Sequence, residues 1–383
     1  MRDIEFMLRV SMGGIGIKNR LDRSSRNFLQ SKANCNVTLF QMFQSNICSP
    51  MVLAFAFGIV CRLIKSELAI PRDLYTSLSI YLLFALGLKG GVELSHSQWQ
   101  QLLVPAIVTV ALGTITPISS FLTLRYLGRF SIADAAGIAA HYGSVSAVTF
   151  IAAEKFAITN LGEGSVAPFM PTLLTLLEIP GIQIALAIGV IGLAKAKRTE
   201  SVATGSPVQD VSGPSFGAVW HELLTARSMV LLIGGMVIGC IIGYEGYASV
   251  KPFFDKGEWM FKGALTLFLL EMGLVAGSRL ADLKHAGAFL IAFGIIAPIV
   301  HGALGVYMGA LAGLNAGSCT VLGAMAASAS YIAAPPAVRM TLPEANPTFY
   351  LTAALAITFP FNLLVGIPLY FRMALAMVGN DLP

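Results

Sequence analysis

Long apolar runs without charge are the dominant pattern along this chain of 383 residues. Residues 286–338 contain no Asp, Glu, Lys or Arg, and neither do residues 345–371. Because about 20 apolar residues cross a bilayer as one helix, the first run is long enough for two spans joined by a short turn, and the second for one. A soluble domain would have too little polar surface to cover such runs. The pattern therefore predicts an all-α integral membrane protein.

Charged residues and Gly/Pro breaks divide the pattern into about ten transmembrane helices. Five are expected near residues 49–64, 74–94, 102–124, 132–153 and 170–194. Five more are expected near residues 228–244, 262–280, 286–313, 317–338 and 347–374. The predicted parts are an N-terminal extension 1–48, expected to be disordered, a first five-helix repeat 49–194, a Ser/Thr/Gly/Pro-rich linker 195–227, a second five-helix repeat 228–374 and a tail 375–383.

The two sets of helices resemble each other in sequence. At one common offset, Gly87, Leu88, Gly91 and Leu94 match Gly273, Leu274, Gly277 and Leu280, and Gly137, Ala140 and Ser144 match Gly323, Ala326 and Ser330. A shared offset in two separate spans indicates an internal repeat. Because each copy has an odd number of spans, the second copy enters the membrane from the opposite side, which is the inverted-repeat plan of secondary transporters.

Secondary transporters of this plan bind their substrate where matched helices break near the middle of the membrane. The predicted fourth and ninth spans contain small, hydroxyl-rich segments, Ala140–Ala147 and Ala326–Ala337. The second segment contains Pro335 and Pro336, which remove two backbone donors and disfavour helix before them. We therefore expect both spans to be broken. The alternative is that Gly, Ala and Ser only allow close helix packing.

Composition agrees with a membrane protein and excludes several other classes. Apolar residues make up 56% of the chain and charged residues 12%, and the mean hydropathy is +0.75. Seven of the 25 Lys and Arg residues lie in the first 32 positions, so the rest of the chain offers no basic patch for nucleic acid. The five cysteines are scattered, and no His, Cys or acidic cluster has the spacing of a transition-metal site.

Loop charge favours one orientation. The loops on the side of the linker carry more Lys and Arg than those on the other side, which places the linker in the cytoplasm and both termini outside. The basic extension 1–48 offsets this preference. The expected location is the inner (plasma) membrane.

Glu178 stands where a charge is expensive, inside the fifth predicted span and just before Ile-Pro. A charged group at the centre of a bilayer costs at least ~2.5 kcal/mol, so it needs a cation, a proton or a partner. Carboxylate, carbonyl and hydroxyl oxygens together suit a hard cation. A protonated structural acid is the alternative. Glu271 in the seventh span favours a structural interpretation more strongly.

The two breaks supply the candidate groups for an anion. Lys and Arg are nearly absent from the middle of the spans, so an anion would be held by helix N-termini, backbone N–H groups and hydroxyls. The candidate substrate-binding residues are Gly143, Ser144, Ser146, Ser328 and Ser330. The candidate gate residues are His141, Tyr142 and Tyr331, although a lone His in a span is usually a neutral hydrogen-bonding residue.

With these segments identified, the region from about residue 50 to 374 resembles the sodium-dependent bicarbonate transporter family of bacteria and cyanobacteria. The resemblance depends on four motifs, which are Gly137–Ala147, Glu178-Ile-Pro180, Ala327–Arg339 and Pro343-Glu-Ala-Asn-Pro347. Two positions differ from the family pattern, since Tyr331-Ile-Ala333 replaces Asp-Ile-Ser and Glu178 replaces Asp. Either change could alter the substrate or the ion ratio.

The resemblance implies a sodium-coupled symporter that imports bicarbonate by an elevator-like movement of a mobile core past a fixed gate. It further implies a homotrimer, Na⁺ as the coupling ion without an organic cofactor, and sodium ligands at Glu178 and Asn346. Members of the family are regulated by a small PII-like protein on the cytoplasmic face, for which residues 195–227 show no recognisable signal.

Two other functions stay open at this point. A symporter of a small organic carboxylate, coupled to sodium or protons, could use the same inverted-repeat plan. A membrane enzyme or sensor would need a catalytic cluster or a soluble domain, and the sequence contains no metal motif and no nucleophile with an adjacent base. We therefore do not expect an enzyme.

Overall fold

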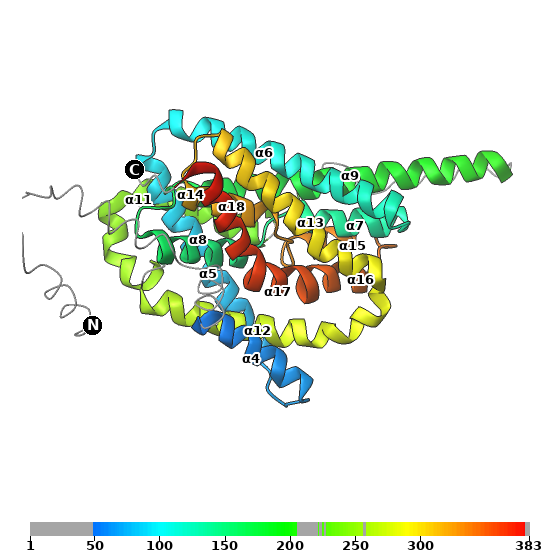
Figure 1. Ribbon diagram of the computed structural model, residues 1–383, viewed down its shortest axis with the longest axis horizontal. Coiled ribbons are helices and arrows are strands. Elements are labelled where there is room, and N and C mark those ends of the chain that lie inside the picture. Colours follow the sequence, from blue (N-terminus) through cyan, green and yellow to red (C-terminus); the bar gives the residue numbers. More distant parts are fainter. Residues whose placement is uncertain (1–48, 205–220, 222–223, 226, 256–257, 380–383) are drawn as a thin grey trace, which may run out of the picture. The chain divides into compact units, whose positions relative to one another are not determined.

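Figure 1 shows the computed structural model, which describes residues 49–204, 221, 224–225, 227–255 and 258–379. The predicted extension 1–48 and most of the predicted linker lie outside these described residues. Within them the chain forms helices and no strands. Eight helical segments are long and apolar enough to cross a membrane, and two shorter helices are also apolar. The prediction of an all-α membrane protein is confirmed, and the count of ten spans stays a prediction.

The first half of the described chain contains six α-helices and one π-helical turn. They are α4 (Pro50–Leu63), α5 (Arg72–His96), α6 (Trp99–Leu122), the π-helical η1 (Thr123–Leu127), α7 (Ile132–Tyr142), α8 (Ala147–Leu161) and α9 (Met170–Thr204). The last helix, α9, continues ten residues beyond the predicted span, into the segment 195–204.

The second half contains α11 (Arg227–Phe254), α12 (Trp259–Arg279), η2 (Leu280–Asp282), α13 (Leu283–Leu311), α14 (Ala316–Ala326), α15 (Ala334–Thr341), α16 (Pro347–Leu351), η3 (Thr352–Thr358), α17 (Phe359–Phe361), η4 (Asn362–Gly366) and α18 (Ile367–Val378). Helix α11 is longer than the predicted span 228–244. It continues past Gly243, whose φ of 57° and ψ of −164° mark a kink that only glycine adopts easily.

Helices α4, α5, α11 and α12 pack with one another, and we call them the four-helix group. Helix α11 lies along α5, and α12 lies along α4 (Figure 1). Glycines set the closeness of the first pair. A Cβ at Gly91 would overlap the carbonyl oxygen of Met236, and a Cβ at Gly239 would overlap that of Leu88. Small residues allow such backbone contact in membrane helices.

Glycines also set the closeness of the second pair, α4 and α12. A Cβ at Gly273 would overlap the carbonyl oxygen of Phe55, and a Cβ at Gly58 would overlap that of Leu270. Gly87 and Gly273, which the sequence comparison matched, therefore both lie where one helix of the group meets the other half of the chain. The internal repeat itself stays a prediction.

The remaining helices form a second group, which we call the core group. In it α9 packs on α6 and α7, α13 packs on α14, and α14 packs on α8. The two groups meet through α5 against α9 and α12 against η3.

The two broken spans begin at similar joints. Asp134, in the first turn of α7, accepts a hydrogen bond of 2.8 Å from the backbone N–H of Asn346, just before Pro347. Ser318, in the first turn of α14, accepts one of 2.8 Å from the backbone N–H of Ala167, just before Pro168. The first joint holds the start of α7 to the start of α16, and the second holds the start of α14 to the segment just before α9.

The glycine contacts lead to a test of helix packing. We expect Gly239→Ala to lower the free energy of unfolding by about 1–3 kcal/mol, because an added methyl group overpacks a tight interface. Gly234→Ala is the matched control, since it lies on the same helix and a Cβ there meets nothing within 4 Å. Thermal unfolding of the detergent-solubilised protein measures the effect. Equal midpoints for the two variants would contradict the packing argument.

Candidate functional site

The first break separates α7 from α8 at residues 143–146, inside the predicted segment Ala140–Ala147. Ser146 is the N-cap of α8, and its hydroxyl accepts a hydrogen bond of 3.2 Å from the backbone N–H of Thr149. The N–H groups of Ala147 and Val148 have no partner within the helix, as at any helix start. The break therefore presents backbone donors and the positive end of a helix dipole inside the protein.

The second break separates α14 from α15 at residues 327–333. Pro335 and Pro336 lie in the first turn of α15, where a missing N–H removes no helical bond. The prolines therefore begin a helix rather than ending one, and the unwound residues precede them. Helix α15 is eight residues long.

Hydrogen bonds join the two breaks directly. The backbone N–H of Ser146 donates to the hydroxyl of Ser328 over 2.9 Å, and this hydroxyl donates to the carbonyl oxygen of Met325 over 2.8 Å. The backbone N–H of Ser330 donates to the carbonyl oxygen of His141 over 2.8 Å. All four candidate serines, 144, 146, 328 and 330, are buried. The structure thus brings together segments that are more than 180 residues apart in the sequence.

The four serine hydroxyls differ in their partners. The Ser328 hydroxyl accepts and donates a bond, and the Ser330 hydroxyl accepts one of 3.3 Å from the backbone N–H of Ala333. The Ser146 hydroxyl also donates to the Tyr331 hydroxyl over 3.4 Å. The Ser144 hydroxyl is buried and has no hydrogen-bond partner among the described residues. Ser144 is therefore the one of these four serines whose hydroxyl makes no hydrogen bond to a described residue.

The candidate gate residues lie in well-packed surroundings. His141 is fully buried, its Nδ1 lies 2.8 Å from the carbonyl oxygen of Gly137, and its ring stacks on Tyr350 at 4.5 Å. The Tyr142 hydroxyl lies 2.5 Å from that of Thr358. Tyr331 is also buried and packs edge-on against Phe359. The gate role of these three residues stays a prediction.

Glu178 lies beside the first break. A Cβ at Gly181 would overlap the carbonyl oxygen of Gly143, so the backbone of α9 touches the unwound residues. The Glu178 side chain is 5% exposed. It lines a pocket of about 10 Å³ together with Ser146, Ser330, Tyr331 and Ser228. A buried carboxylate therefore faces both breaks and several hydroxyl groups.

Asn346 lies elsewhere. Its side chain accepts a hydrogen bond of 3.0 Å from the backbone N–H of Thr348 and caps α16, and the residue is exposed. Its backbone N–H bonds to Asp134 at the start of α7. Asp134 is eight residues before Tyr142, so about 12 Å of helix separates it from the first break. The structure does not bring Asn346 to Glu178, and its sodium role stays a prediction.

Two residues of this region were not predicted from the sequence. Ser228, at the start of α11, faces the Glu178 pocket. The side-chain amide of Asn362 donates a hydrogen bond of 2.8 Å to the carbonyl oxygen of Ala327 in the second break, and it accepts one of 2.9 Å from the hydroxyl of Tyr370. A signal was present for Asn362, because it is an amide inside the charge-free run 345–371. Ser228 had no such signal.

Comparison with known proteins identifies the family. A family model described as the Na⁺-dependent bicarbonate transporter superfamily matches residues 50–375, nearly the whole described chain. The chain belongs to this superfamily. No curated protein matches it. This match confirms the predicted resemblance. The paired breaks and the buried Glu178 described above are therefore features of a member of this superfamily.

The contrast between two serines gives a stability test within this superfamily member. We expect Ser328→Ala to lower the free energy of unfolding by about 1–3 kcal/mol, because it leaves the buried N–H of Ser146 without a partner. Ser144→Ala is the matched control and should change it little, since its hydroxyl has no bond to lose. Thermal unfolding in detergent measures both. A larger loss for Ser144→Ala would show that we have misassigned the structural hydroxyl.

Proposed function

We propose that this protein is a sodium-coupled symporter that imports bicarbonate or a similarly small monovalent anion. One observation carries the proposal, which is that two hydrogen-bonded helix breaks and a buried carboxylate share one pocket. The family assignment supports the choice of sodium and bicarbonate.

The anion would bind at the breaks. The start of α8 offers N–H groups without helical partners and a positive dipole end, which bind anions without any cationic side chain. Ser144 adds a buried hydroxyl. The pocket lining contains no Lys or Arg. Such a site suits one negative charge on a small oxyanion.

The cation would bind at Glu178. A carboxylate in a water-poor setting is costly unless a charge compensates it. The Glu178 pocket adds the hydroxyl-bearing side chains of Ser146, Ser228, Ser330 and Tyr331, and oxygen ligands are those that a hard cation prefers. Sodium at this position would lie close to the anion, so that each ion would raise the affinity of the other by the same factor.

Alternating access would follow from the two helix groups. We propose that the four-helix group stays fixed while the core group carries the breaks across the membrane as an elevator. The backbone contacts between α5 and α11 and between α4 and α12 support a rigid four-helix group. We keep the homotrimer, the cytoplasmic linker with outside termini, the inner-membrane location and a PII-like regulatory partner as proposals from the family resemblance.

Uptake into proteoliposomes tests the function. We expect labelled bicarbonate to accumulate at alkaline pH, where dissolved carbon dioxide is scarce, only when sodium is higher outside the vesicles. A potassium gradient and protein-free vesicles are the controls. Equal uptake with potassium would remove sodium coupling, and uptake of formate or acetate in place of bicarbonate would favour the organic-carboxylate symporter.

In the same assay we expect Glu178→Gln to raise the sodium concentration for half-maximal uptake about tenfold or more, because a charge-assisted ligand contributes about 1.5–3 kcal/mol. Glu67→Gln removes the same charge from an exposed loop residue and serves as the control. Normal sodium dependence in a folded Glu178→Gln protein would exclude Glu178 as the sodium ligand.

A cross-link tests the elevator movement. Leu83 on α5 and Val145 in the first break line the same small pocket from the two helix groups. We expect a short thiol cross-linker between Leu83→Cys and Val145→Cys to stop uptake, and cleavage of the cross-link to restore it. Each single cysteine variant is the control for labelling alone. Full uptake by the cross-linked protein would exclude relative movement of the groups at this point.

A further inference from the structure

A second, larger cavity lies at the end of the four-helix group where α4 and α12 begin and α5 and α11 end. Its volume is about 580 Å³. One wall comes from the four-helix group, including Lys89, Asp255 and Lys262, and the facing wall from α8, including Ile151 and Lys155. Ile151 is one helical turn beyond Ala147, so the cavity reaches toward the first break. We call it the charged cavity.

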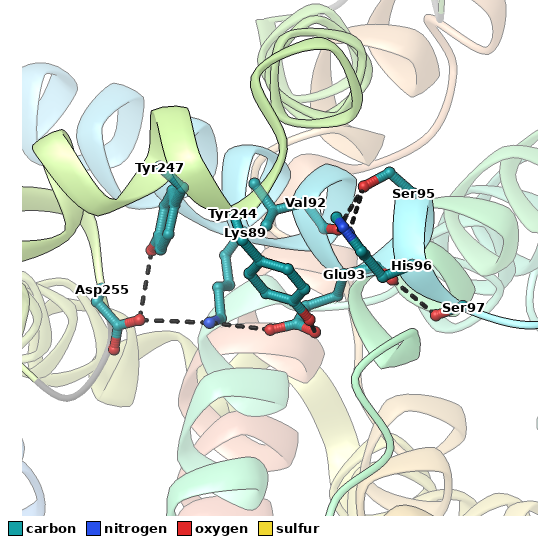
Figure 2. Close-up of polar contacts among 9 residues, drawn as sticks. All are labelled: Lys89, Val92, Glu93, Ser95, His96, Ser97, Tyr244, Tyr247 and Asp255. Atoms are coloured by element: carbon teal, nitrogen blue, oxygen red, sulfur yellow. Dashed lines mark hydrogen bonds and ion pairs between the residues drawn. The ribbon is translucent and has the colours of Figure 1, made fainter.

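The wall formed by α5 and α11 is held by an ion-pair network, which Figure 2 shows. The Lys89 ammonium lies 2.9 Å from a Glu93 carboxylate oxygen and 3.4 Å from one of Asp255. Tyr244 donates a hydrogen bond of 2.6 Å to Glu93, and Tyr247 donates one of 3.5 Å to Asp255. The charge of Lys89 is therefore compensated within the protein, and this wall is fixed.

Lys155 and Lys262 differ from Lys89. Lys155 on α8 is half-buried, and Lys262 on α12 is exposed. Both line the charged cavity. No carboxylate of the described residues lies within 4.0 Å of either ammonium group. Like charges that face one cavity disfavour each other, and a small anion lying between them would relieve this repulsion.

The acidic residues of the cavity narrow the class of ligand. Glu154, Glu163 and Glu258 line the cavity as well, in addition to Asp255 of the network. Lys251 also lines it. A long polyanion would be repelled by these carboxylates, whereas a small anion could lie between Lys155 and Lys262 without spanning the cavity. The lining therefore favours a compact, singly charged oxyanion.

We propose that Lys155 and Lys262 form an anion-binding site in the charged cavity, separate from the breaks, that holds a small monovalent oxyanion. Lys155 is eight residues after Ala147 on the same helix, about 12 Å from the break. An anion released there would reach the break along one face of α8. Identifying this anion with the transported one rests on the proposed function, whereas the existence of the site does not.

Thiol labelling tests the site without any transport. Thr159 lines the same cavity, is exposed and lies one turn after Lys155. The variant Thr159→Cys, in a chain whose five native cysteines are replaced by serine, is labelled with an anionic and with a cationic methanethiosulfonate. The ratio of the two rates reports the local potential. We expect Lys155→Gln with Lys262→Gln to lower this ratio about tenfold, since two unit charges nearby are removed.

Controls and a binding readout complete this experiment. Lys284→Gln removes one exposed charge just after α12 ends, at the other end of this helix from the cavity, and should leave the ratio unchanged. Bicarbonate should slow labelling by both reagents when the two lysines are present, and should have no such effect in the double variant. An unchanged ratio in a folded double variant, or no protection by bicarbonate in its parent, would overturn the site.

Uptake kinetics test whether the site serves transport. We expect the double lysine variant to raise the KM for bicarbonate about fivefold at low ionic strength, with an unchanged maximal rate, because capture is weakened and the break is intact. Added salt should reduce the difference. An unchanged KM would overturn the link to transport. Failure of the proposed function itself would be recognised separately, as absence of sodium-dependent bicarbonate uptake by the unaltered protein.

Discussion

Every backbone N–H and C=O group inside the membrane needs a hydrogen-bond partner, and the rest of this structure depends on this constraint. A helix that unwinds in a membrane exposes N–H and C=O groups to a medium without water, which is tolerated only where protein or a cavity receives them. Here the two breaks receive each other, through Ser146 and Ser328 on one side and Ser330 and His141 on the other. The paired breaks are therefore stable because two unwound segments, far apart in the sequence, complete each other's hydrogen bonds.

The surroundings of the breaks follow from the same constraint. Asn362 provides an amide for the carbonyl of Ala327, and Tyr370 orients this amide. The joints at Asp134 and Ser318 hold the far ends of the two broken spans. Beside the first break, the Ser144 hydroxyl and Nε2 of His141 are buried and have no hydrogen-bond partner among the described residues. Selectivity for a small anion would then depend on a handful of donors whose positions the fold has fixed.

Much of this could be predicted from the sequence, and the reasons differ from residue to residue. Charge-free runs indicate the membrane helices because the hydrocarbon core of a bilayer admits mostly apolar residues. Pro335 and Pro336 show the second break because proline cannot continue a helix from the preceding residues. Ser228 could not be found this way, since its position in the Glu178 pocket depends on the packing of α11 beside α9, which no local pattern encodes. Asn346 was linked to sodium through a family motif, whereas its local sequence, Asn before Pro-Thr, describes a helix cap.

The contact between Gly143 and Gly181 fixes how far the carboxylate at position 178 can reach. Since the two backbones touch without side chains between them, α9 cannot move closer to the break to adjust for a shorter residue. An aspartate at position 178 would hold its carboxyl group one carbon–carbon bond, about 1.5 Å, further back. The glutamate thus extends the acid into the pocket between the breaks, and the length of one side chain sets how much of this pocket stays open.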